Sequence, residues 1–184
     1  MLLPIYAYGH PVLRKVCDDI SPDYPELQTL IANMWETMYH TSGMGLAAPQ
    51  IGLPIRLFVI DTLQLEDTDP ADKLIKQVFI NADIIEEAGK EWDYEEGCLS
   101  IPDIRGKVKR KPQLKLAYLD ENFQPQEQIF DGITARVIQH EYDHIEGKLF
   151  TDRLGLLKRQ LINPALNRIS KGQIKSKYKM IFPL

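Results

Sequence analysis

The run HEYDH at residues 140–144 is the feature that most constrains how this chain can fold. Histidines four residues apart lie on one face of a helix, about one turn from each other, and can ligate the same metal ion. Glu141 would then project toward a water molecule held by that ion. We therefore predict a helix over residues 132–146, with Asp131 as its N-cap and Gly147 as its C-terminal stop. Apolar residues on several of its faces indicate that this helix is central.

A third metal ligand has to come from elsewhere, because catalytic sites of this kind usually combine three protein ligands with one open position. No histidine follows His144, and the only later glutamate, Glu146, is two residues away. Upstream, Cys98 stands in the run EGCLS, where Gly97 would let the backbone approach a helix closely. One thiolate with two imidazoles suits Fe(II), Zn, Co or Ni. Taken alone, Cys98 could equally be a small buried apolar residue.

A third run, GMGLAAPQ at residues 43–50, consists mainly of small residues. Glycine and alanine allow a backbone to come close to a ligand, and Gln50 offers an amide donor at the end of the run. By itself the run is equally compatible with an ordinary turn.

The remaining pattern indicates an α+β fold, with antiparallel sheets around the central metal-binding helix. Apolar spacing predicts a helix over residues 25–39. A helical piece from Leu154 onward is expected to break or restart near Pro164, and the alternation from Ile174 to Phe182 favours a strand. Short apolar runs and turn residues predict strands at 57–60, 78–80, 114–118 and 128–130, the last two forming an antiparallel hairpin.

Length and composition bound the class of protein. A chain of 184 residues with no repeat or linker suggests one domain, residues 1–184. Its apolar runs are far shorter than the roughly 18–20 residues needed to cross a bilayer, and its first residues do not resemble a secretion signal. Two cysteines cannot build a disulfide framework, so we expect the protein to reside in a reducing cytoplasm.

The net charge of −4 hides a strong asymmetry. Residues 153–184 contain eight basic and no acidic residues, whereas residues 1–152 contain 14 basic and 26 acidic residues, a net of −12. The basic segment is either solvated surface that offsets an acidic body, or a docking surface for a polyanion such as RNA.

Taken in order, GMGLAAPQ, EGCLS and QHEYDH resemble the three signature motifs of the peptide deformylases. The resemblance extends from GHP at residues 9–11 to GKLF at residues 147–150. It implies one metal-dependent catalytic domain that removes the formyl group from the N-terminal formyl-methionine of nascent bacterial polypeptides and releases formate. It also implies one divalent metal ion, natively Fe(II), held by Cys98, His140 and His144 with water as the fourth ligand.

The resemblance also implies catalytic roles. Glu141 would act as general base and then as general acid. The Gln50 side-chain amide and the backbone N–H of Leu99 would stabilise the oxyanion that develops on the formyl group.

Substrate contacts follow from the same resemblance. Ile133 and Val137 share the helix face of His140 and are similar in position to family residues that line the methionine pocket, as is Met44. Gly45 and Gly97 would bring backbone groups against an extended substrate peptide. Arg105 is similar in position to a family arginine near that cleft.

Two other functions compete with deformylation. The HEYDH run alone would fit a metalloendopeptidase, although Cys98 as third ligand argues against one. The basic segment 153–184 would fit a non-catalytic, metal-binding module associated with the ribosome. Some deformylases dock on the ribosome through a basic C-terminal helix, but the strand pattern from Ile174 to Phe182 differs from a helix. We expect no membrane partner and no DNA partner.

Overall fold

An antiparallel sheet of five strands, in the order β2-β3-β4-β7-β8, is the frame of the fold. The computed structural model describes residues 1–66, 69 and 72–183, so Leu184, at the end of the expected domain and of its basic segment, lies outside the described residues. The strands are β2 (Gly45–Ala47), β3 (Leu57–Asp61), β4 (Lys76–Ala88), β7 (Gln113–Leu119) and β8 (Pro125–Asp131). They contain the four strands predicted at 57–60, 78–80, 114–118 and 128–130, and the predicted hairpin is confirmed as β7–β8.

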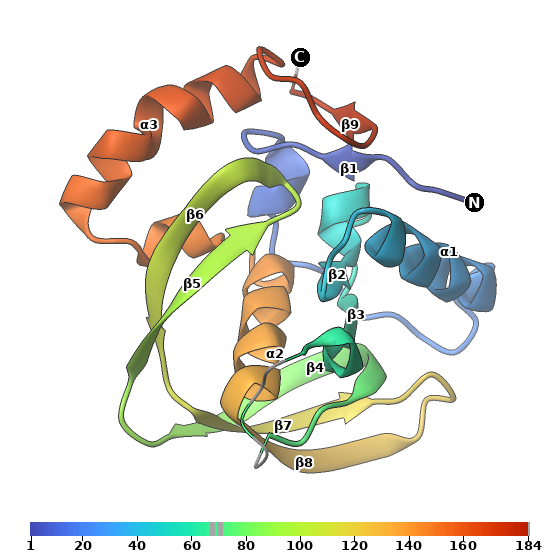
Figure 1. The fold of residues 1–184 in the computed structure, drawn as a ribbon. Coiled ribbons are helices and arrows are strands. Elements are labelled where there is room, and N and C mark those ends of the chain that lie inside the picture. The colour runs from blue at the N-terminus through green and yellow to red at the C-terminus, as the bar shows by residue number, and fades with distance from the viewer. Residues whose placement is uncertain (67–68, 70–71, 184) are drawn as a thin grey trace.

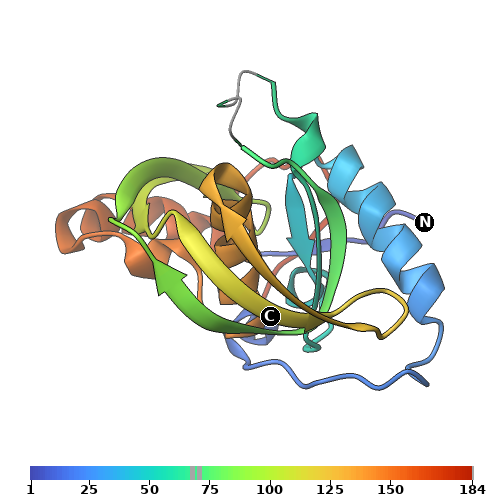
Figure 2. The ribbon, with the colours of Figure 1, turned by 90° about the horizontal axis from the view of Figure 1, so that it is seen from below.

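Helix α2 (Gly132–Ile145) lies at the centre of the fold and confirms the helix predicted over residues 132–146. Both ribbon views show it between the five-stranded sheet and a separate hairpin (Figures 1 and 2). Gly147, with a φ of 68°, follows the end of the helix as predicted. Asp131 is the N-cap residue, as predicted, but its side chain makes no capping hydrogen bond: its carboxylate accepts a hydrogen bond from the Gln113 amide at 2.7 Å instead.

The separate hairpin consists of β5 (Trp92–Cys98) and β6 (Ile101–Arg110), which the sequence pattern did not predict. Cys98 pairs with Ile101, so Leu99 and Ser100 form the turn between the two strands. The hairpin therefore presents Cys98 at the very end of a strand that lies beside α2.

The two faces of the five-stranded sheet carry different helices. Along β3, Leu57 and Val59 belong to the apolar cluster that includes α1 (Leu27–His40), whereas Phe58 and Ile60 belong to the cluster that includes α2. This strand is buried on both faces, which explains its unbroken apolar sequence. The helix predicted over residues 25–39 is confirmed as α1.

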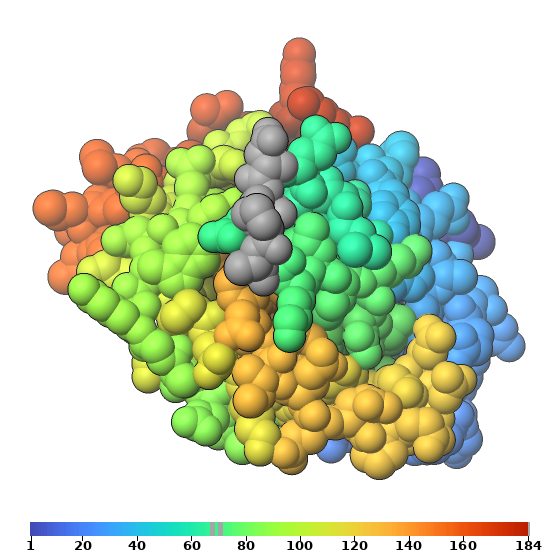
Figure 3. Space-filling view, turned by 60° about the horizontal axis from the view of Figure 1, so that its bottom comes forward, coloured from blue at the N-terminus to red at the C-terminus, as the bar shows by residue number. Residues whose placement is uncertain are grey.

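The turn between β7 and β8 reaches α1 on the lower face of the molecule (Figure 3). There the side-chain amide of Gln28 donates to the carbonyl of Glu121 at 3.2 Å. Short 3-10 helices complete the described chain: η1 (Pro11–Arg14), η2 (Ala48–Ile51), η3 (Thr62–Gln64) and η4 (Phe150–Arg153).

Helix α3 (Leu156–Ser170) continues through Pro164, so the predicted break there is wrong. Buried residues on both sides of the proline, Ile162 before it and Leu166 and Ile169 after it, join one apolar cluster with residues of β6. This packing holds both halves of the helix in line although Pro164 cannot donate a backbone hydrogen bond.

The segment from Ile174 to Phe182 is only partly the strand that its alternation predicts. Regular pairing is confined to β9 (Met180–Ile181), which runs parallel to β1 (Ile5–Tyr6). Side chains from Ile174 to Met180 nevertheless alternate between half-buried and exposed, because the extended chain lies along the surface of the body. The pattern thus predicted the alternating exposure correctly, whereas the strand that it favours is confirmed only at β9.

The mixture of helices with mainly antiparallel sheets confirms the α+β class. Within the described part of the chain, no helix has the length and apolarity required to span a membrane.

Candidate metal and active site

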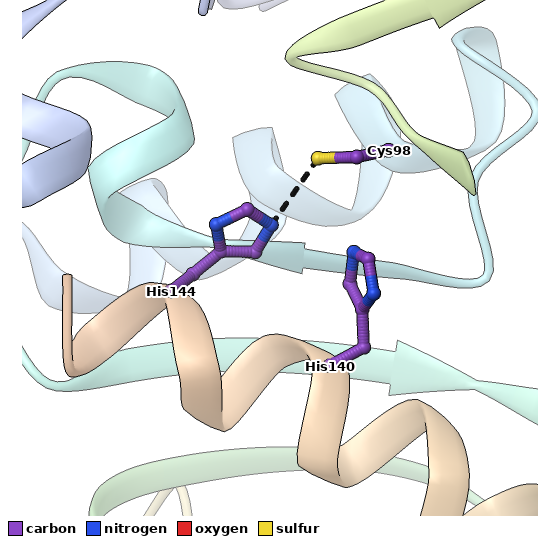
Figure 4. A group of neighbouring side chains, drawn as sticks. All are labelled: Cys98, His140 and His144. Atoms are coloured by element: carbon purple, nitrogen blue, oxygen red, sulfur yellow. Dashed lines mark hydrogen bonds between the residues drawn. The ribbon is translucent and has the colours of Figure 1, made fainter. Parts of the chain in front are cut away.

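Cys98, His140 and His144 meet where the end of β5 lies over α2 (Figure 4). The Sγ atom of Cys98 is 3.3 Å from Nε2 of His144, and one possible ligand atom from each of the three residues lies within 4.8 Å of the others. The two histidines stand one helical turn apart with their rings directed toward the thiol (Figure 4). Because thiolate and imidazole are the donors that Zn and Fe(II) accept, these three residues could hold such an ion.

Glu96 fixes the orientation of His140. Its Oε2 atom lies 2.9 Å from Nδ1 of His140, an arrangement that leaves Nε2 of the ring available as a ligand atom. Burial opposes the negative charge of Glu96, but hydrogen bonds from Arg110 and His140 outweigh it and hold the pKa of Glu96 well below its usual range. Sequence reasoning missed this residue, although its place two residues before Cys98 was a possible signal.

A buried charge network joins the β5–β6 hairpin to α2. Arg110 donates to Glu96 through Nε at 2.7 Å and Nη2 at 2.9 Å, and to Asp143 through Nη1 at 2.8 Å. Arg136 donates to Glu96 at 2.7 Å, and Arg153 makes two bonds of 2.7 Å to Asp143. These arginines compensate both buried carboxylates, so the strand that ends in Cys98 is tied to the helix that carries both histidines.

His144 and Glu141 are buried, and each has one side-chain polar atom without a hydrogen-bond partner among the described residues. These atoms are Nδ1 of His144 and Oε2 of Glu141. Burial lowers the pKa of His144 well below its usual value, which favours the neutral imidazole that binds metals. Burial also raises the pKa of Glu141 to about 7, in the range suited to exchanging protons near neutral pH.

Gln50 and Gly45 shape the space around these groups. The Oε1 atom of Gln50 accepts the backbone N–H of Ala47 at 2.8 Å, which turns its amide N–H₂ toward Cys98 Sγ at 3.5 Å. A Cβ atom on Gly45 would lie 2.7 Å from Cγ and Cδ of Glu141. The small residue is therefore needed to make room for the Glu141 side chain.

A pocket of about 510 Å³ opens over this group of residues. Its lining includes every predicted site residue except His144, which is buried outside it: Met44, Gly45, Gln50, Gly97, Cys98, Leu99, Arg105, Ile133, Val137, His140 and Glu141. Residues that sequence reasoning missed also line it, among them Tyr94, Arg136, Lys175, Lys177 and Tyr178. The last three come from the basic C-terminal segment, whose place beside the pocket no local motif indicates.

Comparison with known proteins gives a consistent result. The family model described as polypeptide deformylase matches residues 2–160. Peptide deformylases of Christiangramia forsetii and Flavobacterium johnsoniae are 54% and 55% identical to the chain; the matches cover 100% and 99% of this chain and 97% and 96% of those proteins. The crystal structure of a peptide deformylase from Legionella pneumophila matches with a TM-score of 0.82 and 36% identity, covering 96% of this chain and 99% of that one.

A plant peptide deformylase structure matches with a TM-score of 0.83 and 31% identity, over 96% of both chains. These relatives give no support to the metalloendopeptidase or to the non-catalytic module. The three sequence motifs, the fold built around them and the relatives agree, and the chain belongs to the polypeptide deformylase family.

Proposed function

We propose that this chain hydrolyses the N-terminal formyl group of formyl-methionyl nascent polypeptides and releases formate. The observation that carries the proposal is the convergence of a possible Cys-His-His ligand set, a buried carboxyl group and an oriented amide donor at one pocket. We further propose that residues 1–184 act as a single catalytic domain in the bacterial cytoplasm.

Cys98, His140 and His144 would hold one divalent ion, Fe(II) in the native protein, although Zn, Ni and Co also suit these donors. The bound ion would supply Lewis-acid chemistry, lowering the pKa of water toward neutrality and polarising the formyl oxygen. Support comes from the donor set itself and from the buried, neutral character of His144.

Glu141 would accept a proton from the attacking water as the water oxygen bonds to the formyl carbon. When the carbon–nitrogen bond breaks, Glu141 would return that proton to the leaving amine, so that formate and a free methionyl amine result. Its pKa of about 7 supports both steps near neutral pH. The Gln50 amide and the Leu99 backbone N–H would donate to the formyl oxygen as negative charge develops there.

Met44, Ile133 and Val137 would form the wall against which the methionine side chain packs. Ile133 and Val137 are almost fully buried on the helix face that carries His140, and all three line the pocket. Gly45 and Gly97 would allow the extended peptide to approach the backbone, with Arg105 at the rim.

The test is a formate-release assay on formyl-Met-Ala. We expect activity that disappears after chelation and returns with Fe(II), and no hydrolysis of acetyl-Met-Ala or of an internal peptide bond. Metal-loaded protein that releases no formate would contradict the proposal.

We also propose that the basic segment 153–184 contacts the ribosome, through the exposed cations of α3. Lys158 and Arg159 are exposed there, whereas Arg153 is already paired with Asp143. Reversing both exposed charges, in Lys158→Glu with Arg159→Glu, should reduce co-sedimentation with ribosomes at low salt.

A matched control reverses two exposed lysines of β6, Lys107 and Lys109, and should sediment like the wild type. Equal sedimentation of both double variants would show that the exposed cations of α3 do not contribute to ribosome binding. Charge reversal is preferable to deleting residues 171–184, because that deletion would also remove residues that line the pocket.

A further inference from the structure

The chain returns to the active site after α3. Its last described residues run back beside the N-terminal strand, where the N–H of Ile5 donates to the carbonyl of Lys179 at 2.9 Å and the N–H of Ala7 to that of Ile181 at 2.8 Å. Figure 1 shows β9 and β1 side by side near the turn of the β5–β6 hairpin. The C-terminal segment is thus part of the wall around the pocket and does not extend away from the body.

This returning segment and Tyr8, two residues beyond β1, hold the hairpin turn that follows Cys98. The hydroxyl of Tyr178 donates to the carbonyl of Leu99 at 2.7 Å, and the N–H of Tyr8 donates to the carbonyl of Ser100 at 2.8 Å. Both carbonyls of the two-residue turn are therefore tethered from outside the hairpin. The Tyr178 ring is half-buried and packs, together with Leu99, against the apolar cluster that contains α1.

We propose that Tyr178 is a positioning residue for deformylation: its hydroxyl holds the carbonyl of the Leu99–Ser100 peptide and thereby restrains the Leu99 backbone, whose N–H, in the preceding peptide, would face the pocket. The proposal rests on the proposed function, in which that N–H stabilises the developing oxyanion. A tether on the Leu99 carbonyl restricts rotation about the Leu99 backbone. A hydrogen-bond donor contributes to catalysis only when it is held at the place where charge develops.

Tyr178→Phe is the most direct test, because it removes the hydroxyl and keeps the ring that packs in the cluster. We expect kcat for formyl-Met-Ala to fall roughly 10-fold, less than the 10²–10³ that loss of an entire oxyanion donor costs, with KM within about twofold of the wild type. Thermal unfolding would verify that the variant is folded.

The matched control is Tyr118→Phe. The Tyr118 hydroxyl also makes two side-chain hydrogen bonds, with Gln77 at 2.8 Å and Gln128 at 3.2 Å, but it lies in β7 and does not line the pocket. This control should retain the wild-type kcat. A second measurement uses zinc-loaded protein, in which ¹⁵N relaxation of the Leu99 amide should report greater mobility in Tyr178→Phe than in the wild type or in Tyr118→Phe.

An unchanged kcat in Tyr178→Phe, or a change confined to KM, would overturn the proposal. Equal losses of kcat in both variants would also overturn it, since they would indicate a general effect of removing a buried hydroxyl. Wild-type protein that releases no formate would instead contradict the proposed function. The mobility of the Leu99 amide would then decide alone whether Tyr178 restrains the turn.

Discussion

Arg110 is a buried cation that links the β5–β6 hairpin to α2. Replacing it with methionine should therefore strongly destabilise the fold. Its side chain is fully buried and donates to Glu96 and to Asp143. Removing one partner from a buried ion pair typically costs about 3–5 kcal/mol, because the remaining charge has lost its compensation. Glu96 keeps Arg136 and Asp143 keeps Arg153, which places the expected loss near the lower end, about 3 kcal/mol.

Arg153→Met is the matched control, because Arg153 binds the same Asp143 carboxylate from the surface. Its side chain is 39% exposed, so water screens the pair and Asp143 keeps Arg110. We expect a loss of about 1 kcal/mol or less. Urea unfolding in the presence of a chelator measures both variants, with metal affinity kept out of the comparison. Equal losses, or less than about 1 kcal/mol for Arg110→Met, would refute this reasoning.

Three further predictions concern the pocket and the second cysteine. Gly45→Ala should lower kcat at least roughly 10-fold, because its Cβ would displace the Glu141 side chain. Gly155→Ala, with no atom within 4 Å of the added Cβ, should leave kcat unchanged. Full activity of Gly45→Ala would show that Glu141 does not need the space beside Gly45. Gln50→Ala should lower kcat about 10²–10³-fold with little change in KM, and a rise in KM alone would contradict its role as oxyanion donor. Cys17 is 5% exposed and burial raises its pKa to about 11, so iodoacetamide at pH 8 should leave it unmodified by peptide mass spectrometry; rapid labelling would show that it is accessible.

Helix α2 and the possible metal ligands could be predicted because local chemistry leaves few choices. Two histidines four residues apart lie on one face of a helix, where they can share an ion, and Gly147 marks where that helix ends. The shortage of other donors made Cys98 a candidate third ligand, and the resemblance of the three motifs to those of the peptide deformylases completed the set. The β7–β8 hairpin was predictable because Leu114, Leu116 and Tyr118 alternate with polar or small residues, which the structure places at half-buried positions.

The β5–β6 hairpin was not predictable because two inward positions of β6 carry residues that do not look apolar. Gly106 faces inward where the Leu154 side chain fills the space, and Arg110 faces inward because it meets Glu96 and Asp143. An arginine buried by distant carboxylates looks in the sequence like any exposed arginine. The same dependence on distant partners hid the contact between Tyr178 and Leu99.

The break predicted in α3 failed for the opposite reason: the local signal was strong, but tertiary packing outweighed it. Pro164 favours a break, but buried residues before and after it pack against β6 in one cluster. Tertiary packing of Ile162 and Leu166 therefore decided the course of the helix. The strand pattern after Ile174 was likewise limited to β9, because pairing requires a partner and β1 is only two residues long.

The most direct test of the account is a comparison of wild-type protein with Glu141→Ala, measuring metal content and formate release from formyl-Met-Ala in the same preparations. Glu141 lines the pocket and stands between the two histidines in the sequence, yet it is not one of the three possible metal ligands. We expect one equivalent of divalent metal in both proteins, with formate release by the wild type and nearly none by the variant. A metal-loaded Glu141→Ala protein with full activity would contradict the mechanism.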